Sequence, residues 1–171
     1  MQQAKVSFNK TTHMKQLLLA IAFISLSFSS FAQGQPTILP SAVFYKQNGT
    51  KMSTAEFPKT KKSLIIFFDA TCPHCQRVVA NLSKQSSKLS KANLYLISQD
   101  EFRSINYFMN NFGKPLMKMK NVTVLRDQYL MFIPTFQPKQ YPSIYLYGTD
   151  RRLMLYSSEE NDVPKFLSLI G

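Results

Sequence analysis

The sequence predicts an α/β fold in which a mixed central sheet is flanked by helices. Apolar, strand-like runs alternate with helix-like segments through the middle of the chain, and a short turn joins two further strand-like runs near its end. Strands that alternate with helices require parallel pairing, whereas a late hairpin adds antiparallel strands to the same sheet. The 171 residues are enough for one domain with its own core.

The first 32 residues have the pattern of a signal peptide that is cleaved after Ala32. Lys15 precedes a run of apolar or small residues at 17–28, and a small-x-small site ends at Ala32. The alternative is a transmembrane anchor, for which this run is short. The cleavage point has no cysteine for a lipid anchor, so we expect no stable membrane anchor after cleavage. Met14, directly before Lys15, makes a better first residue for a signal peptide than Met1. We therefore interpret residues 1–13 as the result of a translation start assigned too early in the sequence.

Cleavage would leave residues 33–171, with 18 basic and nine acidic residues and a net charge of +9. A basic surplus favours acidic partners, but the charges are scattered, which is typical of a solvated surface. The chain has no nucleic-acid-binding motif, and we expect no nucleic acid as partner. The expected location is periplasmic or otherwise extracytoplasmic.

We interpret the cleaved chain as a linker at 33–41 followed by one domain at 42–171. The domain begins with a predicted β-hairpin at 42–46 and 51–52 around the turn Asn48-Gly49. Ser53 and Glu56 then have the spacing of a capping box, which predicts a short helical turn.

In the middle of the domain, the sequence predicts alternating strands and helices. The continuous apolar run Leu64 to Phe68 is typical of a strand buried on both faces. A helix is expected over 73–90, since Val78, Val79, Leu82 and Leu89 form one apolar face. A strand at 94–97, a helix at 102–112 closed by Gly113 and Pro115, and a strand at 122–125 follow.

At the end of the domain, the sequence predicts a second hairpin and a last helix. Residues 127–141 are left unassigned, because Pro134 and Pro138 argue for a loop. Strands at 143–147 and 151–156 flank Gly148-Thr149-Asp150, and Asp162 and Pro164 open a helix at 165–170.

The segment Cys72-Pro73-His74-Cys75 contains the only two cysteines of the chain and joins a predicted strand to a predicted helix. A disulfide between residues so close encloses too little chain to stabilise the fold much. A helix N-terminus stabilises an anion such as a thiolate, and one helical turn separates the two sulfurs by a distance that a disulfide can bridge. The pattern therefore predicts a redox-active dithiol, with Cys72 as the attacking nucleophile and Cys75 as the resolving thiol.

The chain resembles the thioredoxin fold, and more closely the exported thioredoxin-like thiol–disulfide oxidoreductases of the TlpA and ResA type. The resemblance covers nearly all of 38–171 and depends on the early hairpin, the segment 67–75, the inserted helix-strand unit at 100–125 and Tyr141-Pro142-Ser143. The Pro-His pair between the cysteines also occurs in the DsbA oxidases. The resemblance implies that Pro142 is a cis-proline opposite the dithiol, and Pro134 and Pro138 are the competing candidates. Tyr141 would then bind an extended substrate segment.

His74 is the only histidine of the predicted mature chain. It is interpreted as a residue that tunes the dithiol by favouring the thiolate, and the alternative is a solvated helix residue. The resemblance has three departures. Ile66 and Val78 stand where relatives carry acidic residues, and Thr71 replaces the usual tryptophan. An apolar neighbourhood would raise the pKa of a thiol and slow resolution by Cys75.

The predicted function is disulfide exchange with cysteine-containing protein substrates, assisted by a partner that recycles the dithiol, without a cofactor or a metal. One alternative is a Cu(I)- or Zn-binding module that uses Cys72, Cys75 and His74, since thiolates suit these metals. A structural zinc site needs four ligands, and the chain has no second Cys/His pair. The other alternative is a non-catalytic scaffold, against which the intact C-x-x-C argues.

Overall fold

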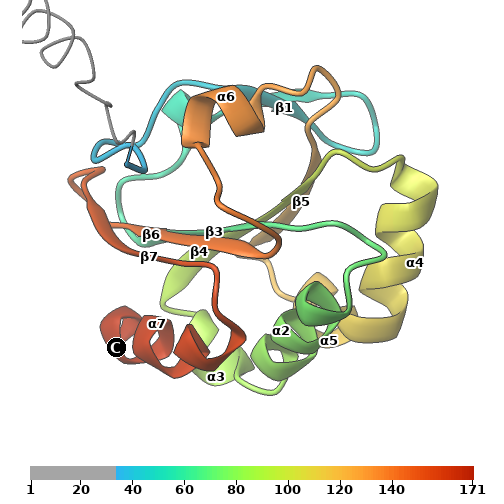
Figure 1. Cartoon of the computed structure of the whole chain (residues 1–171). Coiled ribbons are helices and arrows are strands. Elements are labelled where there is room, and N and C mark those ends of the chain that lie inside the picture. Colours follow the sequence, from blue (N-terminus) through green and yellow to red (C-terminus); the bar gives the residue numbers. More distant parts are fainter. Residues whose placement is uncertain (1–33) are drawn as a thin grey trace, which may run out of the picture. The chain divides into compact units, whose positions relative to one another are not determined.

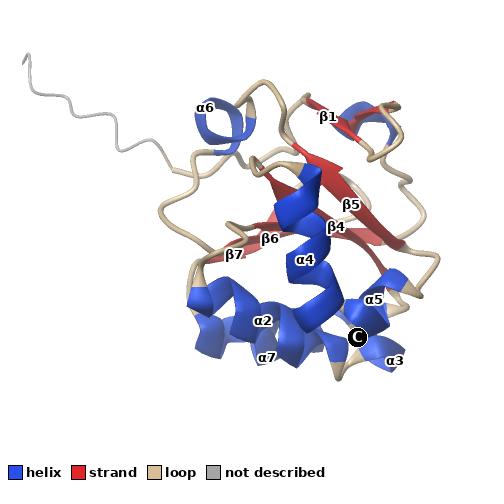
Figure 2. Cartoon of the chain, turned by 90° about the vertical axis from the view of Figure 1, so that its right-hand side faces the viewer, coloured by secondary structure: helices blue, strands red, loops and turns tan. Residues whose placement is uncertain are grey.

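The computed structural model of the protein describes residues 34–171, so the predicted signal peptide lies outside the described residues. Seven strands form one sheet in the order β2-β1-β5-β4-β3-β6-β7. Helical segments lie on both faces of this sheet (Figures 1 and 2). The predicted α/β class with a mixed sheet is confirmed.

Three parallel strands form the centre of the sheet: β3 (Lys62–Phe67), β4 (Ala92–Ser98) and β5 (Val122–Arg126). Antiparallel strands extend this centre on both sides: β1 (Val43–Tyr45) and β2 (Lys51–Ser53) beyond β5, and β6 (Ser143–Tyr147) and β7 (Leu153–Ser157) beyond β3. The first hairpin turns at Gly49, which has a φ of 80°. Glycine adopts such a positive φ without steric cost because it has no Cβ atom. Both predicted hairpins and the predicted capping box at Ser53, which begins η1 (Thr54–Glu56), are therefore confirmed.

Side chains of β3 alternate between two cores, as expected of a strand buried on both faces. Leu64 and Ile66 pack in one core, and Ile65 and Phe67 pack in the other. The first core lies under five helices: α2 (Pro73–Ser83), α3 (Ser86–Leu89), α4 (Phe102–Phe112), α5 (Lys114–Met117) and α7 (Val163–Ile170). The second core lies under the short helix α6 (Phe132–Phe136) and is largely aromatic.

The helix that was predicted over 73–90 is two helices. The N–H groups of Lys84 and Gln85 bond to carbonyls three residues back, which tightens the last turn of α2, and Gln85 then leaves the helical region with φ −116° and ψ 29°. Serine residues flank the break, and serine competes with the helix by bonding elsewhere, as Ser83 does with the carbonyl of Phe112 at 2.9 Å. Leu89 is buried as expected, but it lies on α3.

The unassigned segment 127–141 contains α6, which begins next to a buried carboxylate. Asp127 has no exposed surface, and it accepts hydrogen bonds from the N–H groups of Met131 and Phe132, each at 2.8 Å. Pro134 lies in the first turn of α6, where a backbone N–H has no helical partner to lose.

Part of the predicted linker lies along the edge of the sheet. The N–H of Leu39 donates to the carbonyl of Arg151 at 2.8 Å, and the carbonyl of Thr37 accepts from the N–H of Leu153 at 2.8 Å. Leu39 is buried. Between residues 34 and 171, none of the helices has the length and apolar character that crossing a membrane requires.

Candidate active site

Cys72 lies at the point where the chain turns from β3 into α2. Its N–H donates to the carbonyl of Asp69 at 3.2 Å, which closes a turn. The Asp69 carboxylate holds this turn by accepting from the N–H of Thr71 at 2.7 Å and from its hydroxyl at 2.6 Å. Cys72 is then the N-cap of α2, and Pro73 takes the first helical position. This is the position that the C-x-x-C spacing predicted for the first cysteine.

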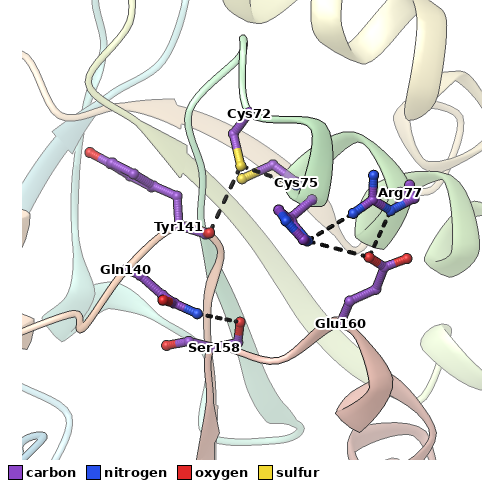
Figure 3. A network of polar contacts seen from close by, with 8 residues as sticks. Cys72, Cys75, Arg77, Gln140, Tyr141, Ser158 and Glu160 are labelled. Carbon is purple, nitrogen blue, oxygen red and sulfur yellow. Dashed lines mark hydrogen bonds and ion pairs between the residues drawn. The ribbon is translucent and has the colours of Figure 1, made fainter.

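The sulfur of Cys72 faces both the helix start and the chain before β6. It accepts a hydrogen bond from the N–H of Cys75 at 3.4 Å, and the carbonyl oxygen of Tyr141 lies 3.8 Å away (Figure 3). A helix N-terminus and an N–H donor both favour negative charge on this sulfur. Cys72 is partly exposed, so an external disulfide can reach the sulfur.

Cys75 lies one turn further along α2 and is completely buried. Both cysteines are free thiols in this structure, and Figure 3 shows their sulfurs side by side. Burial raises the pKa of the Cys75 thiol well above its usual value, and the contact with Cys72 raises it further. Ile66 and Val78 belong to the same apolar core, which explains why the surroundings of Cys75 are dry.

Tyr141 and Pro142 face the dithiol from the other side. Their peptide bond is cis, as the resemblance implied, and it is the only cis bond among residues 34–171. The Tyr141 ring packs against Phe67 with its centroid 4.9 Å away, which fixes the backbone whose carbonyl reaches Cys72. Partial burial raises the pKa of the Tyr141 hydroxyl, and nearby carboxylates add to this.

Two hollows flank Tyr141. One has a volume of about 230 Å³ and is mostly polar; it is lined by His74, Gln140, Tyr141, Ser158, Glu159, Glu160 and Asn161. The other has a volume of about 160 Å³ and is mostly apolar; it is lined by Phe67, Ile133, Pro138, Lys139, Gln140 and Tyr141. The exposed face of the dithiol therefore lies beside surfaces on which a polypeptide segment could rest.

His74 makes its polar contacts along α2 and with the chain before α7. Its Nδ1 lies 2.8 Å from Nη2 of Arg77, and 3.7 Å from the carboxylate of Glu160 on η2 (Glu160–Asp162). Sequence reasoning missed Arg77 and Glu160. The i, i+3 spacing of His74 and Arg77 was available in the sequence, whereas Glu160 comes from 83 residues beyond Arg77.

The metal-binding alternative would require several ligands that lie close together. No group of three or more His, Cys, Asp and Glu side chains within residues 34–171 is arranged to hold a metal ion.

No protein-family model and no curated protein matches the chain, but solved structures do. A putative thioredoxin from Neisseria meningitidis superposes with a TM-score of 0.63 at 21% identity, over 80% of this chain and 89% of the other. A secreted Mycobacterium tuberculosis disulfide oxidoreductase homologous to E. coli DsbE gives 0.60 at 15% identity, over 75% and 95%.

Peroxidoxin BcpB from M. tuberculosis gives a TM-score of 0.63 at 14% identity, over 80% of this chain and 94% of the other. These structural neighbours are named for different kinds of chemistry, and they share one architecture with this chain. The protein therefore has the thioredoxin fold, with the C-x-x-C segment at the start of the helix that follows β3.

Proposed function

We propose that the protein is an exported thiol–disulfide oxidoreductase that exchanges disulfides with cysteine-containing proteins through Cys72 and Cys75. One observation carries the proposal: a partly exposed sulfur at the N-cap of α2 lies beside a fully buried second thiol. A single exposed cysteine would leave a substrate attached, whereas the second thiol allows its release. The thioredoxin fold and neighbours such as the secreted disulfide oxidoreductase support the proposal.

In the reducing direction, the Cys72 thiolate attacks one sulfur of a substrate disulfide. The substrate S–S bond breaks, a mixed disulfide forms, and the first substrate sulfur leaves as a thiolate that takes up a proton. Cys75 then loses its proton and attacks the Cys72 sulfur, which releases the second substrate thiol. Two electrons pass to the substrate and the protein ends with a Cys72–Cys75 disulfide. A recycling partner that carries a dithiol restores it, and the oxidising direction is the reverse.

Substrate binding is proposed to use the backbone of Tyr141. Its carbonyl oxygen lies 3.8 Å from the reactive sulfur, and the hollows on either side leave room for an extended chain. The raised pKa of Cys75 predicts that its attack is the slower step, because only the thiolate is nucleophilic.

The test uses the full chain, expressed with its N-terminal segment and purified after export. The reduced protein is mixed with a protein that contains an accessible disulfide, the two proteins are separated, and the thiols that have formed on the substrate are counted. We expect release by the wild type, none by Cys72→Ser, and a stable covalent adduct through Cys72 with Cys75→Ser. Release by Cys72→Ser at the wild-type rate would refute the proposal. The mass of the purified protein tests export separately, with residue 33 expected as the first residue.

A further inference from the structure

Four large apolar residues lie exposed within a five-residue stretch, between the end of β5 and the first turn of α6. Between 45% and 63% of the surface of each is accessible to solvent: Tyr129, Leu130, Met131 and Ile133. A single exposed apolar residue is ordinary on a protein surface, whereas a cluster of them marks a surface that another molecule covers. We call these four residues the apolar patch.

The fold holds the apolar patch in place through the backbone. Leu130 has a φ of 56°, in the left-handed region that leucine rarely adopts. Its N–H donates to the carbonyl of Asp127 at 3.3 Å, and the buried Asp127 carboxylate accepts from the N–H of Met131 at 2.8 Å. The ring of Tyr129 lies edge-on against Tyr45 of β1, with centroids 5.5 Å apart. These contacts fix the patch on the outside of the domain, where its side chains stay exposed.

Three lysines lie around the apolar patch. Lys51 stands opposite Tyr45 in the β1–β2 pair, and Lys46 follows Tyr45 in the chain. Lys139 lines the same hollow as Ile133. All three lysines are exposed, and none forms an ion pair in the part of the chain that the structure describes.

The charge beside the apolar patch is positive. Segments 43–52 and 128–141 contain neither Asp nor Glu. Between them in the sheet, Arg126 at the end of β5 pairs with Glu101, and Asp127 is buried. Four cations, the three lysines and Arg126, therefore stand against two carboxylates, which leaves a surplus of +2. Such a surplus favours an anionic partner.

The apolar patch lies at one end of the described domain. Figures 1 and 2 both place α6 and β1 at this end and α2, α3 and α7 at the other. A flat surface that touches the patch therefore leaves these three helices facing away from it.

We propose that the apolar patch and its three lysines form a site that rests reversibly on an anionic lipid bilayer. The aliphatic side chains enter the boundary between headgroups and acyl chains, the tyrosine ring lies at the interface, and the lysines contact anionic headgroups. Lysine is depleted at interfaces between proteins, so this combination fits a bilayer better than a protein partner. The contact goes beyond the proposed redox function and does not depend on it.

The first experiment measures sedimentation of the full chain with vesicles of phosphatidylcholine, alone or mixed with one third phosphatidylglycerol. We expect binding to the anionic vesicles to be about tenfold stronger and to weaken with salt. The double variant Leu130→Asn and Met131→Gln should bind them about tenfold less well, and asparagine tolerates the left-handed backbone, so the fold is kept. Lys46→Gln and Lys51→Gln should each lower binding about fivefold, which is ~1 kcal/mol at ~1.4 kcal/mol per tenfold.

Met154→Gln and Lys88→Gln are the matched controls, because each removes an exposed side chain of the same type from outside the patch. Both should leave binding unchanged. Residues 1–33 are the same in every variant, so differences between the variants report on the patch. Wild-type protein that binds neither kind of vesicle, or patch variants that bind as the controls do, would overturn the inference.

Sedimentation without vesicles tests the other occupant of such a patch. A dimer that forms in the wild type and is lost in the Leu130→Asn and Met131→Gln variant would assign the patch to a second copy of the chain and overturn the bilayer contact. Disulfide exchange is measured separately, so the proposed function stands or fails on its own result.

The second measurement uses the absence of tryptophan from the chain. Met131→Trp and Met154→Trp each introduce a single fluorophore, the first within the apolar patch and the second outside it. On anionic vesicles we expect the emission of the Met131→Trp variant to shift to shorter wavelength and to be quenched by brominated acyl chains, with neither change in the Met154→Trp variant. The same response in both variants, or in neither, would contradict the proposed contact.

Discussion

Replacing Asp127 by alanine should destabilise the protein strongly, although the carboxylate has no cationic partner. None of the ion pairs among residues 34–171 includes Asp127, which has no exposed surface. Its oxygens accept from the N–H groups of Met131 and Phe132, each at 2.8 Å, and from the Gln99 amide at 2.9 Å. The carboxylate therefore holds the start of α6, whose Phe132 and Phe136 fill the aromatic core.

The expected loss follows from the donors that Asp127→Ala leaves without an acceptor. An unsatisfied buried donor costs about 1–3 kcal/mol, so that the two backbone N–H groups together cost about 2–6 kcal/mol. Removing a buried charge returns part of this. We expect a net loss of about 2–4 kcal/mol in the free energy of unfolding, and about half as much for Asp127→Asn, which keeps one acceptor oxygen.

Urea unfolding followed by far-UV circular dichroism measures this loss. Asp150→Ala is the matched control, because 62% of the Asp150 side chain is exposed, and we expect it to cost less than about 1 kcal/mol. Equal losses for Asp127→Ala and Asp150→Ala would refute the reasoning that a carboxylate network fixes α6.

Three further predictions follow from the burial of individual side chains. A limiting amount of iodoacetamide should modify Cys72 of the reduced protein first, since Cys75 is buried and its pKa is raised; peptide mapping that finds Cys75 modified first would reverse the assigned roles. The free energy of unfolding of the reduced protein should fall with rising pH, because burial raises the pKa of Cys75, Tyr145 and Tyr147 and the unfolded chain loses protons that the folded state keeps. The fall begins above about pH 9 for Cys75 and above about pH 10 for the two tyrosines, with a slope of ~1.4 kcal/mol per pH unit for each group. Constant stability from pH 8 to pH 11 would contradict this. Phe132→Ala should cost about 3–5 kcal/mol in urea unfolding, since its ring stacks on Phe67 with centroids 4.0 Å apart; a loss below about 1 kcal/mol would show that the stack contributes little.

Local sequence patterns predicted most of the elements because their causes are local. The turn at Asn48-Gly49, the capping box at Ser53 and the apolar run of β3 each depend on neighbouring residues. The spacing of Cys72 and Cys75 likewise predicted that Cys72 lies at the start of α2 and Cys75 one turn further, because a helix repeats every 3.6 residues.

Contacts between distant segments could not be predicted in the same way. The break between α2 and α3 depends partly on Ser83, which bonds to a carbonyl 29 residues away. Helix α6 begins beside the buried Asp127, whose carboxylate also accepts from the amide of Gln99, 28 residues earlier in the chain, and Pro134 argued for a loop. The partners of His74 include Glu160, which is close only after the chain has returned past β6 and β7.

The central claim is that Cys72 and Cys75 act as one two-electron redox pair, and a redox titration tests it most directly. The full chain is equilibrated with glutathione mixtures over a range of potentials, and mass spectrometry of trapped peptides follows both thiols. The account predicts that both thiols disappear together in a single transition and yield a Cys72–Cys75 disulfide. Thiols that titrate independently, or form only mixed disulfides with glutathione, would contradict it.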